Sequence, residues 1–165
     1  MPHLADALAF ARWLTGSRVD AEDVVQEACL KAYAGIETYA GGNPRAWLLT
    51  IVRNVSYTWL AKNRPRALVV AGDLADLDEL TAGKETGTDD PETPEAALIA
   101  KADAVALEAA ISNLPHPFRE VVVLRDINGL AYREIAAMLG VPLGTVMSRL
   151  SRARGLLMSE LGSER

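Results

Sequence analysis

Residues 130–157 read LAYREIAAMLGVPLGTVMSRLSRARGLL, and the spacing of their apolar side chains is that of two helices that cross at a tight turn. Residues 132–139 form the first helix in this interpretation. Gly140 supplies the turn, because glycine adopts backbone angles that other residues avoid. Four apolar residues then recur at the period of one buried helix face: Val146, Leu150, Ala153 and Leu157. We therefore predict a helix-turn-helix.

The opposite face of the second helix is polar and basic. Ser148 and Ser151 carry hydroxyl groups that donate and accept hydrogen bonds, and Arg152 is suited to a bidentate contact with guanine. Arg149 and Arg154 are suited to holding phosphates. This face is typical of a DNA recognition helix, with a helical hairpin of purely structural purpose as the open alternative.

The composition favours a helical protein without a membrane span. Half of the 165 residues are hydrophobic and only 5% are aromatic, which is typical of soluble helical proteins. The longest apolar runs fall far short of the roughly 20 residues that a spanning helix needs. A secretory signal is not expected, since Asp6 and Arg12 interrupt the first apolar stretch. We expect an all-α protein of the cytoplasm.

The sequence lacks the patterns of a catalytic or metal site. Cys29 is the single cysteine, so an internal disulfide is excluded, and no histidine cluster is available to complete a zinc site. We interpret Cys29 as a small buried hydrophobe, with a reactive thiol as the alternative. His116, between two prolines, is interpreted as a surface residue in a helix connection. Because paired carboxylates, an activated nucleophile and a phosphate loop are not evident, we expect no enzyme, metal or cofactor.

The net charge of −5 conceals a strong segregation of charge along the chain. Residues 67–97 hold nine acids and one lysine, a charge of −8, which leaves +3 for the rest of the chain. Residues 38–72 contain five bases and no acid, and residues 135–159 contain three arginines and no acid. Two basic stretches that flank an acidic one indicate nucleic-acid binding more strongly than either stretch alone.

The acidic stretch also indicates how the chain divides into domains. It contains several glycines and prolines and no sustained helical period, which predicts a flexible linker over residues 67–96. The linker separates a domain of residues 1–66 from a domain of residues 97–165. Each is small and must be helical to form a core. In the second domain, helices over residues 98–113 and 118–127 are expected before the helix-turn-helix.

In the N-terminal domain, residues 21–34 are expected to form a helix with Asp20 as its N-cap. The buried face of this helix has four small apolar residues: Val24, Val25, Ala28 and Ala32. The other face is a mixed polar surface with one exposed leucine: Asp23, Gln26, Glu27, Leu30 and Lys31. Such a face suits a partner protein better than DNA, with ordinary solvent exposure as the alternative.

A glycine-rich loop over residues 39–43 is expected to lead into a helix that runs to about residue 63. Several apolar residues of this helix are available for a core: Trp47, Leu48, Ile51, Val52, Val55 and Leu60. Polar, basic and aromatic residues lie elsewhere around it: Arg53, Asn54, Tyr57, Thr58, Lys62 and Arg64. Aromatic rings can stack unpaired bases while cations hold phosphates. Tyr39 and Tyr57 are the better candidates for base contact, since Trp47 is expected in the core.

With both halves in view, the chain resembles the extracytoplasmic-function (ECF) sigma factors, the smallest group of bacterial sigma factors. Residues 20–28, DAEDVVQEA, are similar to the family's segment that docks on the clamp helices of RNA polymerase. Residues 46–54, AWLLTIVRN, resemble its promoter-melting segment. Residues 114–121 and 144–154, the latter GTVMSRLSRAR, are similar to the family's −35 reader. The resemblance implies two helical domains joined by a linker.

The resemblance also implies partners and site residues. The partners are core RNA polymerase, promoter DNA and an anti-sigma factor. Polymerase binding falls on Asp23, Gln26, Glu27 and Leu30. Recognition of the single-stranded −10 element, in which the loop and Asn54 capture a flipped base, falls on Tyr39, Ala40, Gly41, Gly42, Asn43, Arg53, Asn54, Tyr57, Lys62 and Arg64. Recognition of the double-stranded −35 element falls on Arg125, Met147, Ser148, Arg149, Ser151, Arg152 and Arg154. The acidic linker would run toward the RNA path, where its charge mimics nucleic acid.

Met147 departs from the family pattern, because many relatives have Lys or Arg at this position. An apolar contact, such as one to a thymine methyl group, then replaces a cationic one. The first helix is also short, since only residues 2–15 precede Gly16. Two other classes stay open: a conventional helix-turn-helix regulator, which would not need the N-terminal match, and a sigma mimic that titrates an anti-sigma factor, which need not keep Arg149 and Arg152.

Overall fold

The computed structural model describes residues 3–39, 41–65 and 104–163, and these residues divide into two compact units. All regular secondary structure in the described residues is helical. The prediction of an all-α protein with two small helical domains is therefore confirmed. The linker expected over residues 67–96 and the first six residues of the helix expected over 98–113 lie outside the described residues, as do Ala40 and Arg66.

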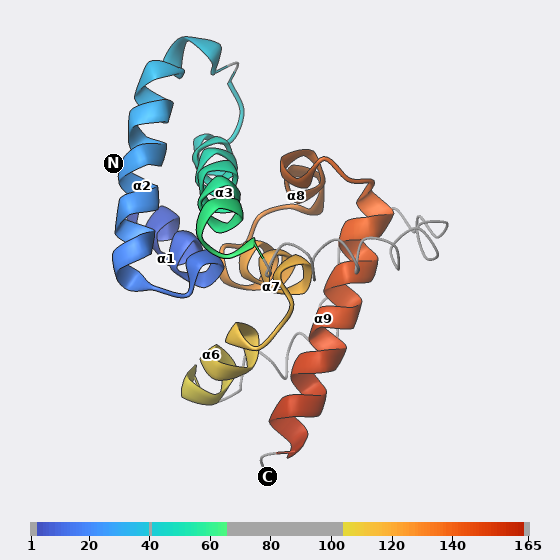
Figure 1. The fold of residues 1–165 in the computed structure, drawn as a ribbon. Coiled ribbons are helices and arrows are strands. Elements are labelled where there is room, and N and C mark those ends of the chain that lie inside the picture. Colours follow the sequence, from blue (N-terminus) through green and yellow to red (C-terminus); the bar gives the residue numbers. More distant parts are fainter. Residues whose placement is uncertain (1–2, 40, 66–103, 164–165) are drawn as a thin grey trace. The chain divides into compact units, whose positions relative to one another are not determined.

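The first unit is formed by α1 (Leu4–Thr15), α2 (Arg18–Ala34), a 3-10 turn (Ile36–Thr38) and α3 (Pro44–Asn63), and α2 and α3 lie side by side (Figure 1). Each helix contributes one apolar face to a shared core. Its fully buried side chains include Phe10, Leu14, Val24, Ala28, Leu49, Val52 and Leu60. The expected buried face of α2 is confirmed, since Val25 and Ala32 are buried as well.

A sharp corner joins α1 to α2. Gly16 ends α1 with φ of 75°, a left-handed conformation that favours glycine, and its N–H donates to the Arg12 carbonyl. Ser17 is the N-cap of α2, because its hydroxyl accepts a hydrogen bond from the Asp20 N–H at 3.4 Å. The prediction that Asp20 caps a helix starting at residue 21 is therefore wrong. The helix begins one turn earlier, at Arg18.

Helix α3 begins as predicted, after a loop in which Gly41 and Gly42 both have φ of 92°. The Asn43 carboxamide oxygen accepts from the Arg45 N–H at 3.0 Å, and Pro44 occupies the first turn, where its missing N–H costs nothing. The core prediction for α3 is correct for four residues: Leu48, Val52, Val55 and Leu60. Trp47 and Ile51 are only half-buried, so the expectation that they belong to the core is wrong.

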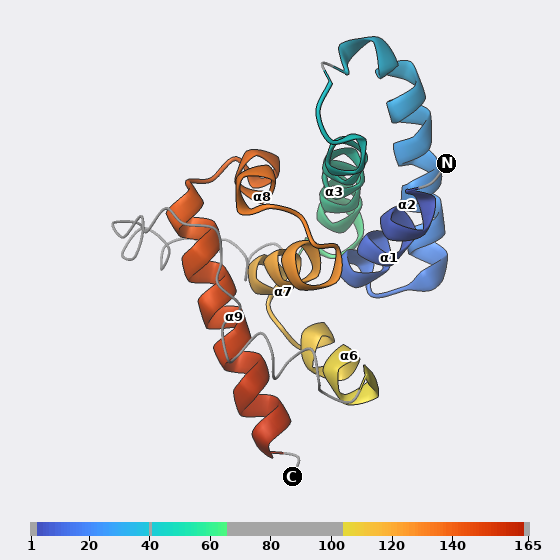
Figure 2. The same ribbon diagram turned by 180° about the vertical axis from the view of Figure 1, so that it is seen from behind.

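The second unit is formed by α6 (Ala104–Ser112), α7 (His116–Val122), a π-helical segment (Val123–Ile127), α8 (Tyr132–Leu139) and α9 (Leu143–Ser163) (Figure 2). The helix expected from residue 118 begins two residues earlier, since Pro117 fits a first turn. His116 is its first residue and is half-buried rather than a surface residue of the connection.

The helix-turn-helix forms as predicted. Helix α8 has the predicted bounds, and Gly140 ends it with φ of 66°. The Glu134 carboxylate accepts from the Ala131 N–H at 3.1 Å and so stabilises the first turn of α8. The predicted buried stripe of α9 is confirmed, because all four of its side chains are at most 1% exposed: Val146, Leu150, Ala153 and Leu157.

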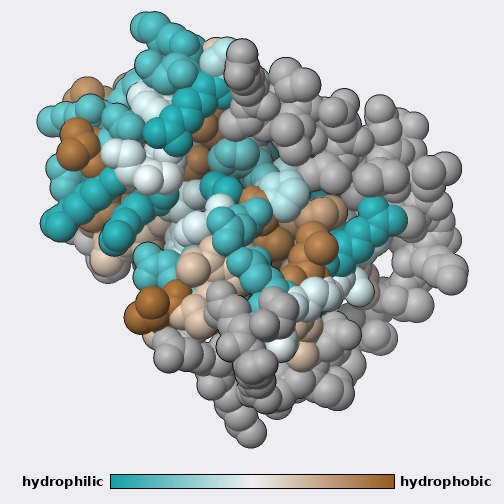
Figure 3. All heavy atoms as spheres, turned by 60° about the horizontal axis from the view of Figure 1, so that its bottom comes forward, coloured by the Kyte–Doolittle hydropathy of each residue, from teal (hydrophilic) through white to brown (hydrophobic). Residues whose placement is uncertain are grey.

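Polar and apolar side chains are both exposed on the described part of the chain. On the face shown in Figure 3, hydrophilic side chains predominate and hydrophobic ones form separate patches. The large hydrophobic residues that are exposed include Leu4, Val19, Leu30, Tyr33 and Ile36 in the first unit. Across the described residues, no helix is both long enough and apolar enough to cross a membrane.

Substitution of two glycines of the second unit by alanine should change the stability of the unit in opposite directions. Gly140 has a left-handed backbone, so Gly140→Ala is expected to cost about 1–2 kcal/mol although a Cβ would meet no atom within 4 Å. Gly155 lies inside α9 with equally open space around a Cβ, so Gly155→Ala is expected to stabilise by up to about 1 kcal/mol. Thermal denaturation followed by circular dichroism checks both. A shift of the midpoint in the same direction for both variants would contradict this account.

Candidate functional site

The outward face of α9 begins one turn after its start. Ser151 is exposed, and Met147, Ser148, Arg149 and Arg152 are half-buried. The Ser148 hydroxyl donates to the Thr145 carbonyl at 3.1 Å, which leaves its oxygen able to accept from a ligand. These residues share one side of the N-terminal half of the helix, opposite the buried stripe. The face therefore has the polarity and exposure that a recognition helix needs.

Arg154 does not belong to this face. It is only 5% exposed, and its guanidinium donates to both carboxylate oxygens of Asp126, at 2.6 and 3.2 Å. The two donors form the fork that a carboxylate accepts best. We therefore correct the expectation that Arg154 holds a DNA phosphate, because its charge is neutralised within the unit. The pair instead ties α9 to the π-helical segment.

Arg125 has a similar structural task at the start of the helix-turn-helix. Its guanidinium donates to the Leu130 carbonyl at 2.9 Å and lies over the Tyr132 ring, 4.6 Å from the centroid. The side chain is half-buried. Both contacts orient the segment that leads into α8. Arg125 is thus a weaker candidate for DNA contact than Arg152.

In the first unit, the loop before α3 is held by its own side chains. The Tyr39 hydroxyl donates to the Gly42 carbonyl at 2.6 Å, and the Tyr39 ring lies 5.2 Å from the Trp47 ring, tilted by 53°. Asn43 is occupied as the N-cap of α3. These contacts hold Tyr39 and Asn43 in place without a ligand, and both rings remain partly accessible.

A pocket of about 350 Å³ lies between the end of α2, the 3-10 turn and α3. Its lining residues are Lys31, Gly35, Thr38, Trp47, Ile51, Asn54, Val55 and Thr58. The exposed residue Asn54 borders this pocket, and the half-buried Trp47 and Ile51 form its apolar wall. The pocket explains why these two residues are not in the core. It combines an apolar wall with amide and hydroxyl groups, as a site for a single base requires.

The basic residues of α3 and of its C-terminal end differ from one another in their contacts. The Arg53 guanidinium lies 4.5 Å from the centroid of the Tyr57 ring, a stacked pair of the kind that contacts single strands. Lys62 is exposed. Arg64 instead donates to the Thr15 carbonyl at 3.0 Å and lies 5.7 Å from the Trp59 centroid. Arg64 therefore joins the end of α3 to the α1–α2 corner, a role that was not predicted.

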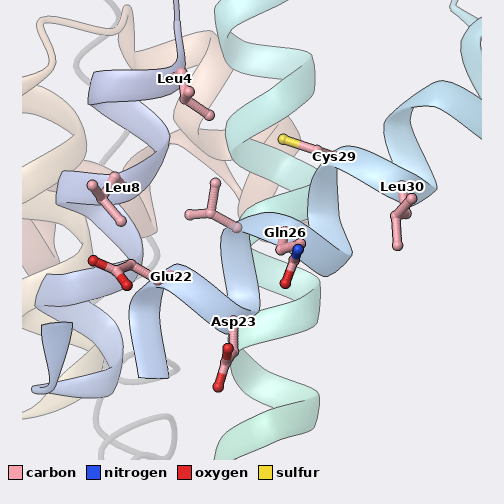
Figure 4. A pocket seen from close by; sticks show the side chains of 8 residues that line it. Leu4, Leu8, Glu22, Asp23, Gln26, Cys29 and Leu30 are labelled. Carbon is pink, nitrogen blue, oxygen red and sulfur yellow. The ribbon is translucent and has the colours of Figure 1, made fainter. Parts of the chain in front are cut away.

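The outward face of α2 borders a groove shared with α1 (Figure 4). The groove has a volume of about 620 Å³ and is lined by Leu4, Leu8, Glu22, Asp23, Val25, Gln26, Cys29 and Leu30. Leu30 is 69% exposed, and Gln26 lies between it and the carboxylates of Asp23 and Glu22, which are farther along α2. Glu27 is exposed outside the groove, paired with Lys31 at 3.7 Å. Cys29 is half-buried in the groove wall rather than buried, which corrects its interpretation as a core residue.

Sequence patterns did not identify Asp126 as the partner of Arg154, nor Lys31 and Thr38 as residues that line the pocket beside Asn54. Asp126 lies 28 positions before Arg154, and no local period connects them. Lys31 was assigned to a face of α2, with no indication that it also borders α3. In the part of the chain that the structure describes, no group of three or more His, Cys, Asp or Glu side chains is arranged to hold a metal ion.

Both units match family models. Residues 1–66 match sigma-70 region 2, and residues 104–157 match sigma-70, region 4. The ECF RNA polymerase sigma factor SigE of Mycolicibacterium smegmatis is 37% identical over 148 residues, which cover 90% of this chain and 54% of that protein. The ECF RNA polymerase sigma-E factor of Haemophilus influenzae is 32% identical over 149 residues, which cover 88% and 76%. The chain thus spans about half the length of the first relative.

A solved structure is similar over nearly the full chain. It is the co-crystal structure of the sigma factor RpoE with the anti-sigma factor NepR from Bartonella quintana. The TM-score is 0.70 at 30% sequence identity, and the match covers 99% of this chain and 94% of that one.

Alanine variants of Arg152 and Arg154 in α9 should distinguish a surface role from a structural one. Arg154→Ala leaves the Asp126 carboxylate without its partner in a partly buried place, so a loss of about 3 kcal/mol is expected. Arg152→Ala should change stability by less than about 0.5 kcal/mol, because Arg152 lies outside the buried stripe. Urea denaturation of the full chain measures both. Equal stability of the two variants would show that the Asp126–Arg154 pair does not hold α9.

Proposed function

The chain belongs to the ECF sigma factors, and from this premise we propose that it binds core RNA polymerase and directs it to promoters by recognising −35 and −10 elements and melting DNA. The proposal rests most on the presence, in one chain, of a recognition helix and of a pocket suited to an unpaired base. A conventional helix-turn-helix regulator needs only the first. A mimic that titrates an anti-sigma factor needs neither the basic face nor the pocket.

We assign the −35 contacts to the outward face of α9. Ser151 and Arg152 contact base edges, Arg149 a phosphate, and Met147 the methyl group of a thymine. Their position on the face opposite the buried stripe, where each is at least partly accessible, supports these roles. Arg154 is left out, since its guanidinium is paired with Asp126.

We assign capture of a −10 base to the pocket beside Asn54. The hydrogen bonds of Tyr39 and Asn43 support this role, because side chains that are already held in place lose less entropy on binding. Flipping a base costs a few kcal/mol, which stacking and polar contacts in the pocket must offset. Arg53, Tyr57 and Lys62 extend the site along the strand.

We assign polymerase docking to the outward face of α2, formed by Asp23, Gln26, Glu27 and Leu30. The combination of exposed acids with an exposed leucine beside a groove supports a protein partner with both apolar and basic groups. In this proposal residues 1–66 carry docking and −10 recognition, and residues 97–165 carry −35 recognition. Residues 67–96 supply an acidic connection between them.

We also propose control by an anti-sigma factor. The related RpoE, 30% identical to this chain, was solved in complex with the anti-sigma factor NepR. A partner that covers the docking face of α2 or the outward face of α9 would block initiation without any change in the core.

Two variants test the assignment of the two DNA sites. Asn54→Ala should abolish or strongly reduce promoter melting and leave −35 duplex affinity and polymerase binding unchanged, because Asn54 acts only on the opened strand. Arg152→Ala should weaken −35 duplex binding by about 1–3 kcal/mol and relax preference at one base pair. Permanganate footprinting reports melting, and gel shifts with duplex DNA report affinity. Normal melting by Asn54→Ala, or an unchanged base preference in Arg152→Ala, would reject the corresponding assignment.

A further inference from the structure

Lys31 belongs to the docking helix α2, yet it is one of the residues that line the pocket that Asn54 borders on α3. We propose that Lys31 is a DNA-contacting residue, which binds a phosphate of the non-template strand beside the base held in the pocket. This inference rests on the proposed function of the pocket. It gives α2 a part in −10 recognition in addition to polymerase docking.

The composition of the pocket supports a phosphate contact at this position. Among the described residues that line it, Lys31 carries the only formal charge. Trp47, Ile51 and Val55 make the interior apolar. A base can enter such a space, but its phosphates cannot shed their water there and must stay at the rim. Lys31 is suited to meet them, because its side chain is 57% exposed and comes from the last turn of α2.

The two threonine hydroxyls of the pocket cannot take over this task. Thr38 donates its hydroxyl proton to the Gly35 carbonyl at 2.6 Å, and Thr58 donates to the Asn54 carbonyl at 2.9 Å. Each oxygen is left to accept, and an acceptor does not bind a phosphate oxygen. The remaining side-chain donors of the lining are Asn54, Trp47 and Lys31, of which only Lys31 adds charge.

The present partner of Lys31 does not oppose this role. The ammonium lies 3.7 Å from the Glu27 carboxylate, one turn back on the same helix, and both side chains are more than half exposed. Exposed pairs of this kind contribute little and exchange readily. Glu27 is also assigned to polymerase docking, so engagement of Glu27 by the polymerase would release Lys31 toward the DNA.

Arg18 offers a matched control on the same helix. It forms an equivalent pair with Glu22, at 3.4 Å and four residues apart, with side chains 75% and 55% exposed. Arg18 stands at the other end of α2 and does not line the pocket. Arg18→Ala and Lys31→Ala therefore remove one cation and one exposed ion pair each. Only the second removes a charge from the pocket.

The test uses the complex of the full chain with core polymerase and a fluorescein-labelled single-stranded oligonucleotide. Its sequence is the non-template −10 region of the strongest start site that this complex uses. Lys31→Ala should weaken binding about three- to tenfold, and Arg18→Ala should leave it unchanged. The slope of log affinity against log salt should fall by about 0.7 for Lys31→Ala alone, as expected for one phosphate contact. Lys31→Arg should restore both values.

Equal affinity and equal salt slope for Lys31→Ala and Arg18→Ala would overturn the role of Lys31 while leaving the proposed function intact. Failure of the wild-type complex to bind the oligonucleotide better than core polymerase alone would overturn the proposed function and the role of Lys31 together. Thermal denaturation of each variant shows whether it is folded, and both are expected to be, because both side chains are exposed.

Discussion

Each unit of this chain has a single small core, so every helix must give one face to it, and only the opposite face is left for partners. This constraint organises the whole structure. In α2 the inward face is made of alanines and valines, and the outward face of acids with Leu30. In α9 the inward stripe from Val146 to Leu157 leaves Ser151 and Arg152 outside. The surfaces assigned to partners are therefore the helix faces that the core leaves exposed.

The same constraint makes the units' internal polar contacts important, because few apolar contacts are available to orient a helix. Arg154 lies at the edge of the buried stripe, next to Ala153, and reaches Asp126 on the π-helical segment. Arg64 joins the end of α3 to Thr15 at the α1–α2 corner. Each contact fixes a helix whose outer face is assigned to DNA. Two arginines that resemble surface cations in the sequence thus support those surfaces from behind.

Periodicity was sufficient to predict most of the fold. The bounds of α8, the start of α3 and the stripe of α9 followed from apolar spacing, from Gly140 and from the glycines and proline of residues 41–44, since these signals are local. Partners distant in sequence were not predictable. Nothing near Arg154 points to Asp126, and nothing near Trp47 shows that it faces a pocket rather than the core. The sequence therefore predicted which helix faces are exposed to partners, and the structure showed which side chains on different helices contact one another.

The central claim is that one chain unites polymerase docking with recognition of two promoter elements, and transcription with purified core polymerase on a genomic DNA library tests it most directly. The measurement is the position of the 5′ ends of the transcripts, with and without this chain. The account predicts a discrete set of new start sites that share a −35 and a −10 sequence. Start sites identical to those of core polymerase alone would contradict it.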